Sequence, residues 1–509
     1  MPSLENIVES LALLAGGIAN ASSLSVLLAT LVGVLVGLLV GVLPGLGPAA
    51  GVAIMLPLAV GFGGVEAIAG LGGIYYGAMF GGAVTSILLG IPGESASVMT
   101  VIDGHAMAKK GQAGEALGLS VFSSFIGGVI GLLLMATLAL VIARVALRFG
   151  PTEMTAVMAF AFSLVSVLGG RNIIKGFTAL FIGIWVGMIG MDPIAGPARY
   201  TFGLLDLIDG IDFTIIAVGI FGLSEIFLSL SDKVSGSTSV ASYSFRSLFP
   251  RISHILKCKG AILSGSLIGV VVGILPGVGA TVATMLAYAG AKKYSKNKEE
   301  FGHGAMEGVA APEASNNSAA YVSMVPMFTL GIPGSATTAI LMGGLLMIGL
   351  QPGPLLFTNN PEFVWTVFGS FWVGNVMLLF LTLLLIPLMA SIVFISTALL
   401  YPIVIGIILF GVFSINFSMS DVLIALVAGG VGYAMLKLDY SPVPLVLGLV
   451  LGPLLENNIR RTLILSQGDL SVFFNRPISF AFFLATLLVI LFPLLAKWLR
   501  HRQVLRAAS

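Results

Sequence analysis

Two short stretches carry residues suited to binding an anion. The sequence reads LLGIPGESAS at residues 88–97 and TLGIPGSATT at residues 329–338, and both share Gly-Ile-Pro-Gly inside apolar sequence. Pro removes a backbone donor and Gly permits unusual dihedral angles, so each core predicts a break in a helix. A helix that begins after each break would point free N–H groups and partial positive charge at an anion. The predicted substrate-binding residues here are Gly93, Ser95, Ser97, Gly334, Ser335, Thr337 and Thr338.

Broken backbone at membrane depth survives only where it is buried in protein or lines a watery cavity. Two such helix starts would together form a cradle for an anion with several carboxylates, with little need for arginine. The sequence agrees, because no Lys or Arg occurs between residues 299 and 436. The alternative is that the Gly-Pro breaks are kinks that serve only helix packing.

A second polar segment, EGVAAPEASNNSAAYVSM at residues 307–324, lies between apolar stretches. Carboxylate and amide oxygens suit Na⁺ or a titrating proton, so Glu307 and Glu313 are predicted to couple an ion to transport. Asn316 and Asn317 are predicted to bind substrate, and the alternative for the whole segment is an extracellular loop. Glu94 is a further candidate for holding the ion, unless it caps the helix that follows it.

A third pair of stretches reads GVLPGLGPAAGVAIMLP at residues 41–57 and GILPGVGATVATMLAY at residues 273–288. The Gly-rich run in the first lacks the spacing of a dinucleotide site and the Lys of a P-loop, so nucleotide binding and an ATP-driven pump are discounted. Their shared Leu-Pro-Gly-x-Gly motifs add candidates to the substrate-binding set, namely Pro44, Gly45, Gly47, Pro276, Gly277 and Gly279.

The composition places these motifs in a membrane. The 509 residues are 57% hydrophobic and only 9% charged, which leaves too little charge to cover a water-facing surface. The net charge of +2 gives no reason to expect nucleic acid. One Cys and four scattered His match no disulfide framework and no metal-ligand spacing, so no cofactor is expected beyond a coupling Na⁺ or H⁺. The prediction is an all-α polytopic membrane protein with about ten to twelve crossings.

The matched motifs predict an internal repeat. Pro44 and Pro276 are 232 positions apart, and Gly90 and Gly331 are 241 apart. A duplication with small insertions explains both offsets. The predicted organisation is a first transmembrane repeat at 1–230 that opens with an interfacial helix at 1–20, a basic linker at 231–260, and a second repeat at 261–509 with a basic tail.

Charge gives the orientation. No Lys or Arg precedes Lys109, whereas the linker and the tail are both rich in them. The positive-inside rule places linker and tail in the cytoplasm and the N-terminus outside, so the two repeats would be inverted relative to each other. The basic loop at 291–298 would also be cytoplasmic, so 261–290 must return to its starting side. A re-entrant hairpin fits its two short arms, and two short tilted crossings are the alternative.

These motifs, with TVIDGHAMAKKGQAGEALG (100–118), APEASNNSAA (311–320) and KLDYSPVPLVLGLVLGPLLENNIRR (437–461), resemble the large membrane subunit of the tripartite tricarboxylate transporter family. The resemblance covers residues 25–500. It implies a permease in the bacterial inner membrane that takes up citrate or related organic acids, driven by an ion gradient. It also implies two partners, a small membrane subunit and a periplasmic solute-binding protein. It leaves a homo-oligomer open.

Two other functions compete with the symporter. A passive anion channel with two half-helix hairpins would use the same breaks but would not accumulate substrate. A polytopic membrane enzyme would need a catalytic constellation at membrane depth, such as His-x-x-Glu-His, and the sequence contains none. The sequence therefore predicts a transporter and not an enzyme.

Overall fold

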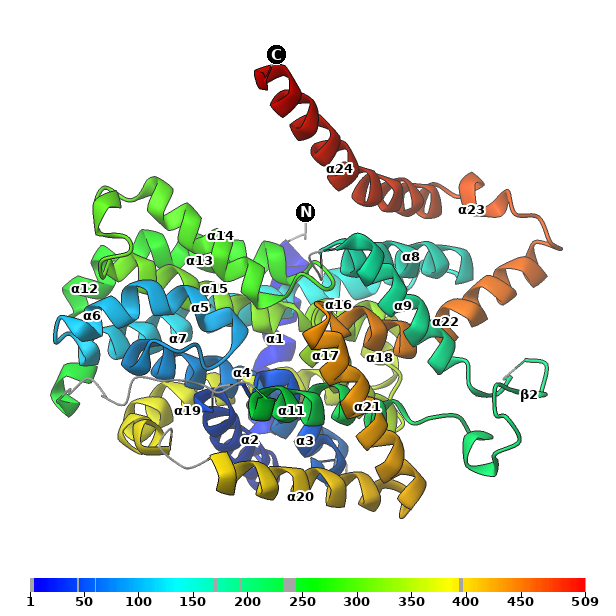
Figure 1. The fold of residues 1–509 in the computed structure, drawn as a ribbon, viewed down its shortest axis with the longest axis horizontal. Coiled ribbons are helices and arrows are strands. Elements are labelled where there is room, and N and C mark those ends of the chain that lie inside the picture. Colours follow the sequence, from blue (N-terminus) through cyan, green and yellow to red (C-terminus); the bar gives the residue numbers. More distant parts are fainter. Residues whose placement is uncertain are drawn as a thin grey trace. The chain divides into compact units, whose positions relative to one another are not determined.

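Helices account for nearly all of the regular structure in the computed structural model (Figure 1). The structure describes residues 4–43, 45–59, 61–168, 172–192, 194–231, 244–392 and 397–508. Pro44, Lys233 and the basic side chains of the tail beyond residue 492 lie outside the described part, so their predicted roles stay predictions.

The chain divides into two compact units, and each draws on both halves of the sequence. The first unit comprises Met1–Ala146 and Thr214–Ala434, and the second comprises Leu147–Phe213 and Met435–Ser509. In the part of the first unit before residue 147 the elements, with short 3₁₀ or π turns labelled η, are α1 (Leu4–Ala21), α2 (Leu24–Val42), α3 (Pro48–Ala59), α4 (Gly64–Leu89), η1 (Ser95–Ser97), α5 (Val98–Thr100), η2 (Val101–His105), α6 (Ala106–Lys109) and α7 (Ala113–Ala146).

The later part of the first unit contains α10 (Phe213–Ala217), η4 (Val218–Leu223), α11 (Ser224–Ser231), η5 (Phe245–Leu248), α12 (Ile252–Lys257), α13 (Lys259–Gly273), α14 (Gly279–Tyr294), η6 (Lys298–Glu300), α15 (Met306–Val322), α16 (Met324–Leu330), α17 (Ala336–Met347), α18 (Pro354–Asn359), α19 (Pro361–Ile392), α20 (Thr397–Asn416) and nearly all of α21 (Met419–Lys437). The second unit contains α8 (Pro151–Leu168), α9 (Ile173–Gly187), β1 (Gly190–Met191), β2 (Ala198–Arg199), η3 (Leu205–Leu207), α22 (Pro442–Leu465), α23 (Val472–Asn475) and α24 (Pro477–Ala508).

Among the described residues, nine helices are long and apolar enough to cross a membrane, and one bent pair would make ten. The chain is therefore a multi-pass membrane protein with slightly fewer full spans than the ten to twelve expected. Shorter apolar helices such as α3, α9 and α17 account for the difference, because 12 to 15 residues rise only about 18–23 Å.

The expectation of purely helical structure is wrong in one place. The apolar helix α9 ends at Gly187, and the antiparallel ladder of β1 and β2 follows it. Gly190 has φ +116°, and a Cβ there would lie 2.8 Å from the backbone of Gly210. Only Gly allows this close approach of the two backbones, which lies three residues after the end of α9, at the start of β1.

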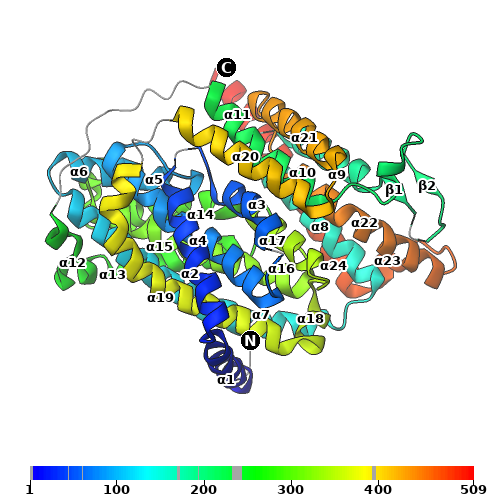
Figure 2. The same cartoon turned by 90° about the horizontal axis from the view of Figure 1, so that it is seen from below.

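Glycines spaced by four residues set the packing of the first unit. Gly33, Gly37 and Gly41 of α2 face the backbone of α4 so closely that a Cβ would lie 2.1 Å from the Gly70 carbonyl oxygen, 2.6 Å from that of Ile74 and 2.2 Å from that of Ala78, respectively. Contacts advance in the same direction along both helices, so α2 and α4 are parallel, and Figure 2 shows them side by side. Small residues at this spacing let transmembrane backbones approach closely.

The same arrangement recurs in the second half. Gly265, Gly269 and Gly273 of α13 stand 232 positions after the three α2 glycines, and they pack against the backbone of α15 from Ala311 to Ala319. Helices α13 and α15 are also parallel, with α14 running back between their ends. Because Ala261 packs near Tyr288 while Val272 packs near Ala283, α13 and α14 form an antiparallel hairpin. This confirms two short arms joined at the Leu-Pro-Gly motif, and the re-entrant path stays a prediction.

The N-terminal helix α1 is present as expected over most of 1–20, and it packs along α19. A Cβ on Gly17 would lie 2.0 Å from the Trp365 carbonyl oxygen, so the two backbones touch there. Asn20 also donates a hydrogen bond to Glu362 at the start of α19, over 3.4 Å. The helix is therefore docked on the protein, and its interfacial position stays a prediction.

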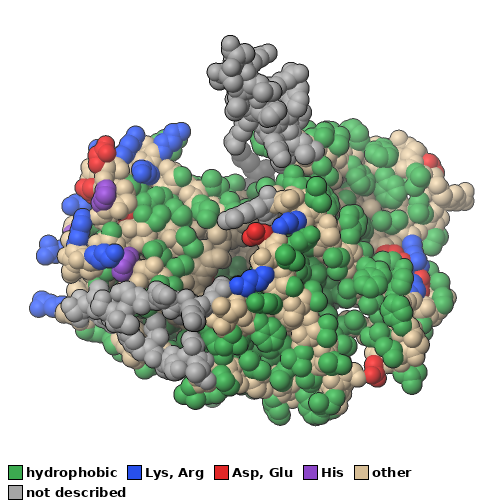
Figure 3. Space-filling model, in the orientation of Figure 1, with side chains coloured by type: hydrophobic (Ala, Val, Ile, Leu, Met, Phe, Trp, Pro, Cys, Tyr) green, Lys and Arg blue, Asp and Glu red, His purple; other side chains and the backbone are tan. Residues whose placement is uncertain are grey.

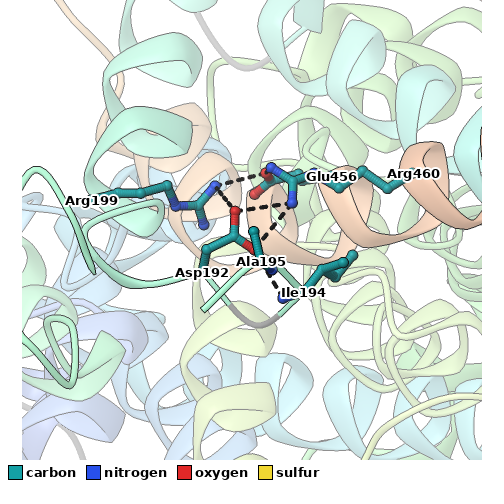
Figure 4. Close-up of polar contacts among 6 residues, drawn as sticks. All are labelled: Asp192, Ile194, Ala195, Arg199, Glu456 and Arg460. Carbon is teal, nitrogen blue, oxygen red and sulfur yellow. Dashed lines mark hydrogen bonds and ion pairs between the residues drawn. The ribbon is translucent and has the colours of Figure 1, made fainter. Parts of the chain in front are cut away.

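In the second unit, an ion-pair network fastens the β1–β2 hairpin to α22 (Figure 4). Arg460 donates to both carboxylate oxygens of Asp192 at 3.0 and 2.9 Å, and Arg199 reaches Glu456 at 2.7 Å. Asp192 also accepts hydrogen bonds from the backbone N–H groups of Ile194 and Ala195. Together these donors lower the pKa of Asp192 to about 2, the backbone bonds contributing most and Arg460 and Arg199 adding to them.

Candidate functional site

Both Gly-Ile-Pro-Gly stretches break the chain in the same conformation. Helix α4 ends at Gly90 with φ +71°, and α16 ends at Gly331 with φ +68°, which are left-handed caps that favour Gly. A new helical segment then begins after Glu94 in the first copy and after Ser335 in the second, each in an extended conformation with a capping box. The two helix starts predicted from the sequence are thus present. The copies match in the left-handed cap and the capping box, but the first continues through 3₁₀, α and π turns and the second as the regular helix α17.

In the first copy, Glu94 caps its own helix. Its Oε2 accepts a hydrogen bond from the Ala96 N–H at 2.9 Å, and Ser97 Oγ accepts one from the Glu94 N–H at 3.3 Å. Glu94 is only 5% exposed, so its carboxylate already fills the position at this helix start that an anion would take. The alternative that Glu94 acts as a cap agrees with the structure.

In the second copy, two of the predicted hydroxyl donors serve the cap. Ser335 Oγ accepts from the Thr338 N–H at 3.2 Å, and Thr338 Oγ1 accepts from the Ser335 N–H at 2.7 Å. Thr337 is buried beside them. The N–H groups of Ala336 and Thr337 stand in the first turn, where a helix offers no carbonyl to accept from them. The donors available to an anion here are therefore backbone N–H groups more than hydroxyls.

The polar segment 307–324 is helical and buried, so its reading as an extracellular loop is wrong. Glu313 is completely buried in α15 and accepts hydrogen bonds from the hydroxyls of Thr100, at 2.5 Å, and Ser124, at 2.9 Å. Asn316 lies one turn later and donates to Glu94 Oε1 over 3.1 Å. The structure therefore brings Glu94, Glu313 and Asn316 into one buried cluster.

Two side-chain oxygens in this cluster accept no hydrogen bond from the described residues. The side-chain carbonyls of Asn316 and Asn317 are buried without a hydrogen-bond partner there, while Asn317 donates its amide to the Glu313 carbonyl at 3.2 Å. Buried oxygens of this kind usually have a partner, and a cation or a donor from a ligand would supply one. Glu307 is not part of the cluster, because it lies half-buried in the first turn of α15, about 9 Å along the helix from Glu313.

The tip of the α13–α14 hairpin contacts both breaks. The Gly277 N–H donates to the Gly334 carbonyl at 2.9 Å, and Thr281 donates to Ser95 Oγ at 3.0 Å. Gly277 and Gly279 have φ +77° and +69°, and Pro276 beside them is half-buried. The second Leu-Pro-Gly motif is thus placed at the breaks, as its predicted role requires.

The first Leu-Pro-Gly motif lies elsewhere in the first unit. Gly45 is exposed with φ +87°, and a Cβ there would lie 2.5 Å from Ser229 Oγ of α11. Gly47 is half-buried and faces open space. What approaches the first break is instead the end of α2, since a Cβ on Gly93 would lie 2.2 Å from the Gly41 carbonyl. Within the described residues, Gly45 and Gly47 are not in contact with the buried cluster.

Tyr75 was not among the predicted site residues, yet it joins the two halves. Its hydroxyl, fully buried in α4, shares hydrogen bonds with Ser323 Oγ at 3.2 Å and Ser335 Oγ at 3.4 Å. It thereby holds the second break from the first half, while Asn316 holds the first break from the second half. A signal was available, because Tyr75 and Tyr76 align with Asn316 and Asn317 in the repeat.

Asp103 is a further residue near the first break that had no predicted role. It is completely buried in the π-helical turn η2, and its Oδ1 accepts from the N–H groups of Gly302, Gly304 and Ala305 at 2.8 to 2.9 Å. Its Oδ2 accepts from the Tyr288 hydroxyl at 2.8 Å. Asp103 thus fastens the segment after the first break to the loop that precedes α15.

Comparisons with known proteins agree with one another. The model of the Tripartite tricarboxylate transporter TctA family matches residues 27–447. A protein of Agrobacterium vitis named "Uncharacterized 52.8 kDa protein in TAR-I ttuC' 3'region" is 39% identical over 428 residues, which is 84% of this chain and 85% of that protein. A second, "Uncharacterized protein in TAR-II ttuC' 3'region", is 42% identical over 211 residues, or 42% of this chain and 87% of that protein. No solved structure matches the chain.

Proposed function

The chain belongs to the tripartite tricarboxylate transporter TctA family, and we propose that it moves citrate-like tricarboxylates or related organic acids into the bacterial cell on an ion gradient. Family membership makes it the large transmembrane component of such a system and not an enzyme. The family also implies the general partners of the tripartite system, a small membrane subunit and a solute-binding protein. The substrate, the direction and the coupling ion belong to the proposal.

The observation that carries the proposal is the joining of the two breaks through one buried polar cluster. Asn316 of the second half bonds Glu94 at the first break, and Tyr75 of the first half bonds Ser335 at the second. A movement of one break would therefore move the groups that hold the other. Alternating access requires such coupling at a site between two repeats. Pure packing kinks would not need to bury carboxylate, amide and phenol groups together, because such burial is costly.

In this proposal a substrate carboxylate binds at the second break. The N–H groups of Ala336 and Thr337 would donate to it, in the way the Ala96 N–H donates to Glu94 in the first copy. The cap formed by Ser335 and Thr338 would hold those donors in place. Glu94 fills the equivalent position in the first copy, which supports one substrate site instead of two equal ones.

The coupling ion would bind beside this site. Glu313 with Thr100 and Ser124, and the unpartnered carbonyl oxygens of Asn316 and Asn317, offer the oxygen ligands that Na⁺ prefers, while Glu313 alone could carry a proton. Because Asn316 also touches Glu94, occupation of the ion site would change the groups that hold the first break.

The inverted topology and the orientation remain part of the proposal, and two observations favour the orientation. Lys and Arg side chains gather at the end of the first unit where α6, α12 and the loop after α14 lie, on the left of Figures 1 and 3. Lys110 donates there to the His303 carbonyl at 2.6 Å, so two basic loops meet. By the positive-inside rule that end would be cytoplasmic, with the N-terminus periplasmic and the C-terminus cytoplasmic.

Uptake into proteoliposomes tests the function. The purified chain, its small membrane subunit and the solute-binding protein would be supplied with labelled citrate while Na⁺ and proton gradients are imposed separately. We expect accumulation above the outside concentration with one of the two gradients and little uptake at low citrate without the partners. Equilibration without accumulation under either gradient would instead identify a passive anion channel.

A further inference from the structure

The segment before α13 turns sharply out of the line of that helix. Residues Phe245–Lys257, comprising η5 and α12, meet α13 at 87°. Helix α13 runs parallel to α15 inside the membrane part of the first unit, since their backbones touch along three successive turns. A segment perpendicular to a membrane helix runs along the membrane surface.

Contacts with α7 fix how this segment lies. Leu248 is completely buried, and its carbonyl stands so close to α7 that a Cβ on Gly118 would lie 2.1 Å from it. His254 of α12 pairs with Glu115 of α7. One face of the segment is therefore held against the protein, and the opposite face has a defined direction.

The outward face combines apolar and basic side chains. Phe249 is 54% exposed, Ile252 76% and Leu256 59%, and the ring of Phe245 packs edge-on against Phe249 with 5.8 Å between centroids. Exposed Arg246, Arg251, Lys257 and Lys259 stand among them. Large apolar side chains exposed beside cations are typical of helices that lie in a membrane interface and contact anionic lipids.

The surroundings add positive charge. Lys110 donates to the His303 carbonyl, and Lys292 and Lys293 directly follow Ala291, which packs in one cluster with Ala261 of α13. Figure 3 shows blue side chains gathered at this end of the unit, with some red ones among them. Glu115 is engaged by His254, and exposed Glu299 and Glu300 lie in η6 after α14. Residues 244–259 themselves contain no Asp or Glu, so this segment is positively charged.

We propose that residues 244–259, here called the linker anchor, bind the interface of an anionic lipid leaflet. The exposed apolar side chains enter the boundary between head groups and acyl chains, and Arg246 and Arg251 contact lipid phosphates. Because α13 follows directly and its hairpin ends at Gly277 against the second break, the anchor sets the depth of that hairpin in the membrane. The inference rests on the membrane location of the chain and not on its substrate.

The first test compares thermal unfolding of the detergent-purified chain with added phosphatidylcholine, phosphatidylglycerol or inorganic phosphate. Phosphatidylglycerol should raise Tm above the value in phosphatidylcholine, and the effect should shrink with salt. The double variant R246E/R251E should lose this rise while keeping the Tm of the parent in phosphatidylcholine. The control R461E changes an exposed Arg on α22 and should keep the rise. An equal rise in R246E/R251E, or an equal effect of inorganic phosphate, would overturn the lipid anchor.

A second test needs no loss of charge. The Phe249→Trp variant is placed in vesicles that contain phosphatidylglycerol, and its tryptophan fluorescence is compared with that of the parent chain, which has four Trp. The additional fluorescence of the variant should be quenched by lipids brominated on their acyl chains. Added fluorescence that these lipids leave unquenched would place position 249 in water and refute the proposed insertion.

Discussion

Asn316 of α15 donates a hydrogen bond to Glu94 across 3.1 Å, joining residues that lie 222 positions apart in the chain. The bond ties the middle of one repeat to the helix start of the other. Glu94 is held on its other oxygen by its own helix, so the Asn316 bond makes the position of its carboxylate depend on the second half.

Replacing Asn316 by Ala should weaken binding of the coupling ion. The change leaves a buried carboxylate short of one donor and removes an oxygen ligand, which costs roughly 1.5–3 kcal/mol, or about tenfold or more in ion affinity. Uptake measured against ion concentration should therefore require a higher concentration for half its maximum. Asn458→Ala, whose amide bonds the Leu454 carbonyl of its own helix, is the matched control. An unchanged ion dependence in Asn316→Ala would contradict the proposed ion site.

Two substitutions of Ser335 should have opposite effects on stability and binding. Ser335→Ala removes the cap of α17 and should cost about 0.5–2 kcal/mol of stability while leaving the Ala336 and Thr337 N–H groups free to bind. Ser335→Glu recreates the arrangement of Glu94, so it should keep the cap but occupy those N–H groups with its own carboxylate. Tm and citrate affinity of the purified variants separate the two. Citrate binding that survives in Ser335→Glu would move the substrate site elsewhere.

Neighbouring glycines in α1 should respond differently to the same change. A Cβ at Gly17 meets the Trp365 carbonyl at 2.0 Å, whereas a Cβ at Gly16 meets nothing within 4 Å. Gly17→Ala should force α1 away from α19 and lower Tm, while Gly16→Ala should be neutral or stabilise by up to about 1 kcal/mol through helix propensity. Protease digestion of the N-terminus in both variants reports the displacement directly. Equal behaviour of the pair would mean that α1 is not docked on α19.

The β1–β2 hairpin should resist mild acid. The pKa of Asp192 is lowered to about 2 from an ordinary value of 3.8, so its ionised form stabilises the folded hairpin above about pH 3.8, and this contribution disappears as pH falls toward 2. Proteolysis of residues 188–212 should be constant above about pH 4 and increase below it. Asp192→Asn should show the increased cleavage at neutral pH and lose the acid transition. A transition near neutral pH in the parent chain would indicate a different titrating group.

Much of the site could be predicted because its signals are local. The Gly-Ile-Pro-Gly motifs predict both helix ends and both new starts, and Gly90 and Gly331 adopt the left-handed conformation that only Gly reaches without strain. The apolar α2 and α19 could be recognised from their composition. Helix α4 was harder, because its many Gly and two Tyr look less like a span, although it is one of the nine.

The rest depends on contacts between distant residues, which composition does not encode. Whether Ser335 and Thr338 offer hydroxyls to a ligand or use them in a cap depends on rotamers and backbone angles. Burial of Glu313 depends on Thr100 and Ser124, which are about 200 residues away. Likewise, α8 and α9 from the first half form one unit with α22 and α24 from the second half. The spacing of motifs along the chain does not predict this grouping.

The docking of α1 on α19 has a consequence for synthesis. Asn20 and its partner Glu362 are separated by 342 residues, and ribosomes add about 5–20 residues per second. Helix α1 therefore waits roughly 20–70 s after its own synthesis before its binding surface on α19 is made. During that time the surface around Gly17 is open to chaperones and membrane proteases, so an unpaired α1 marks an incomplete copy of this protein for quality control.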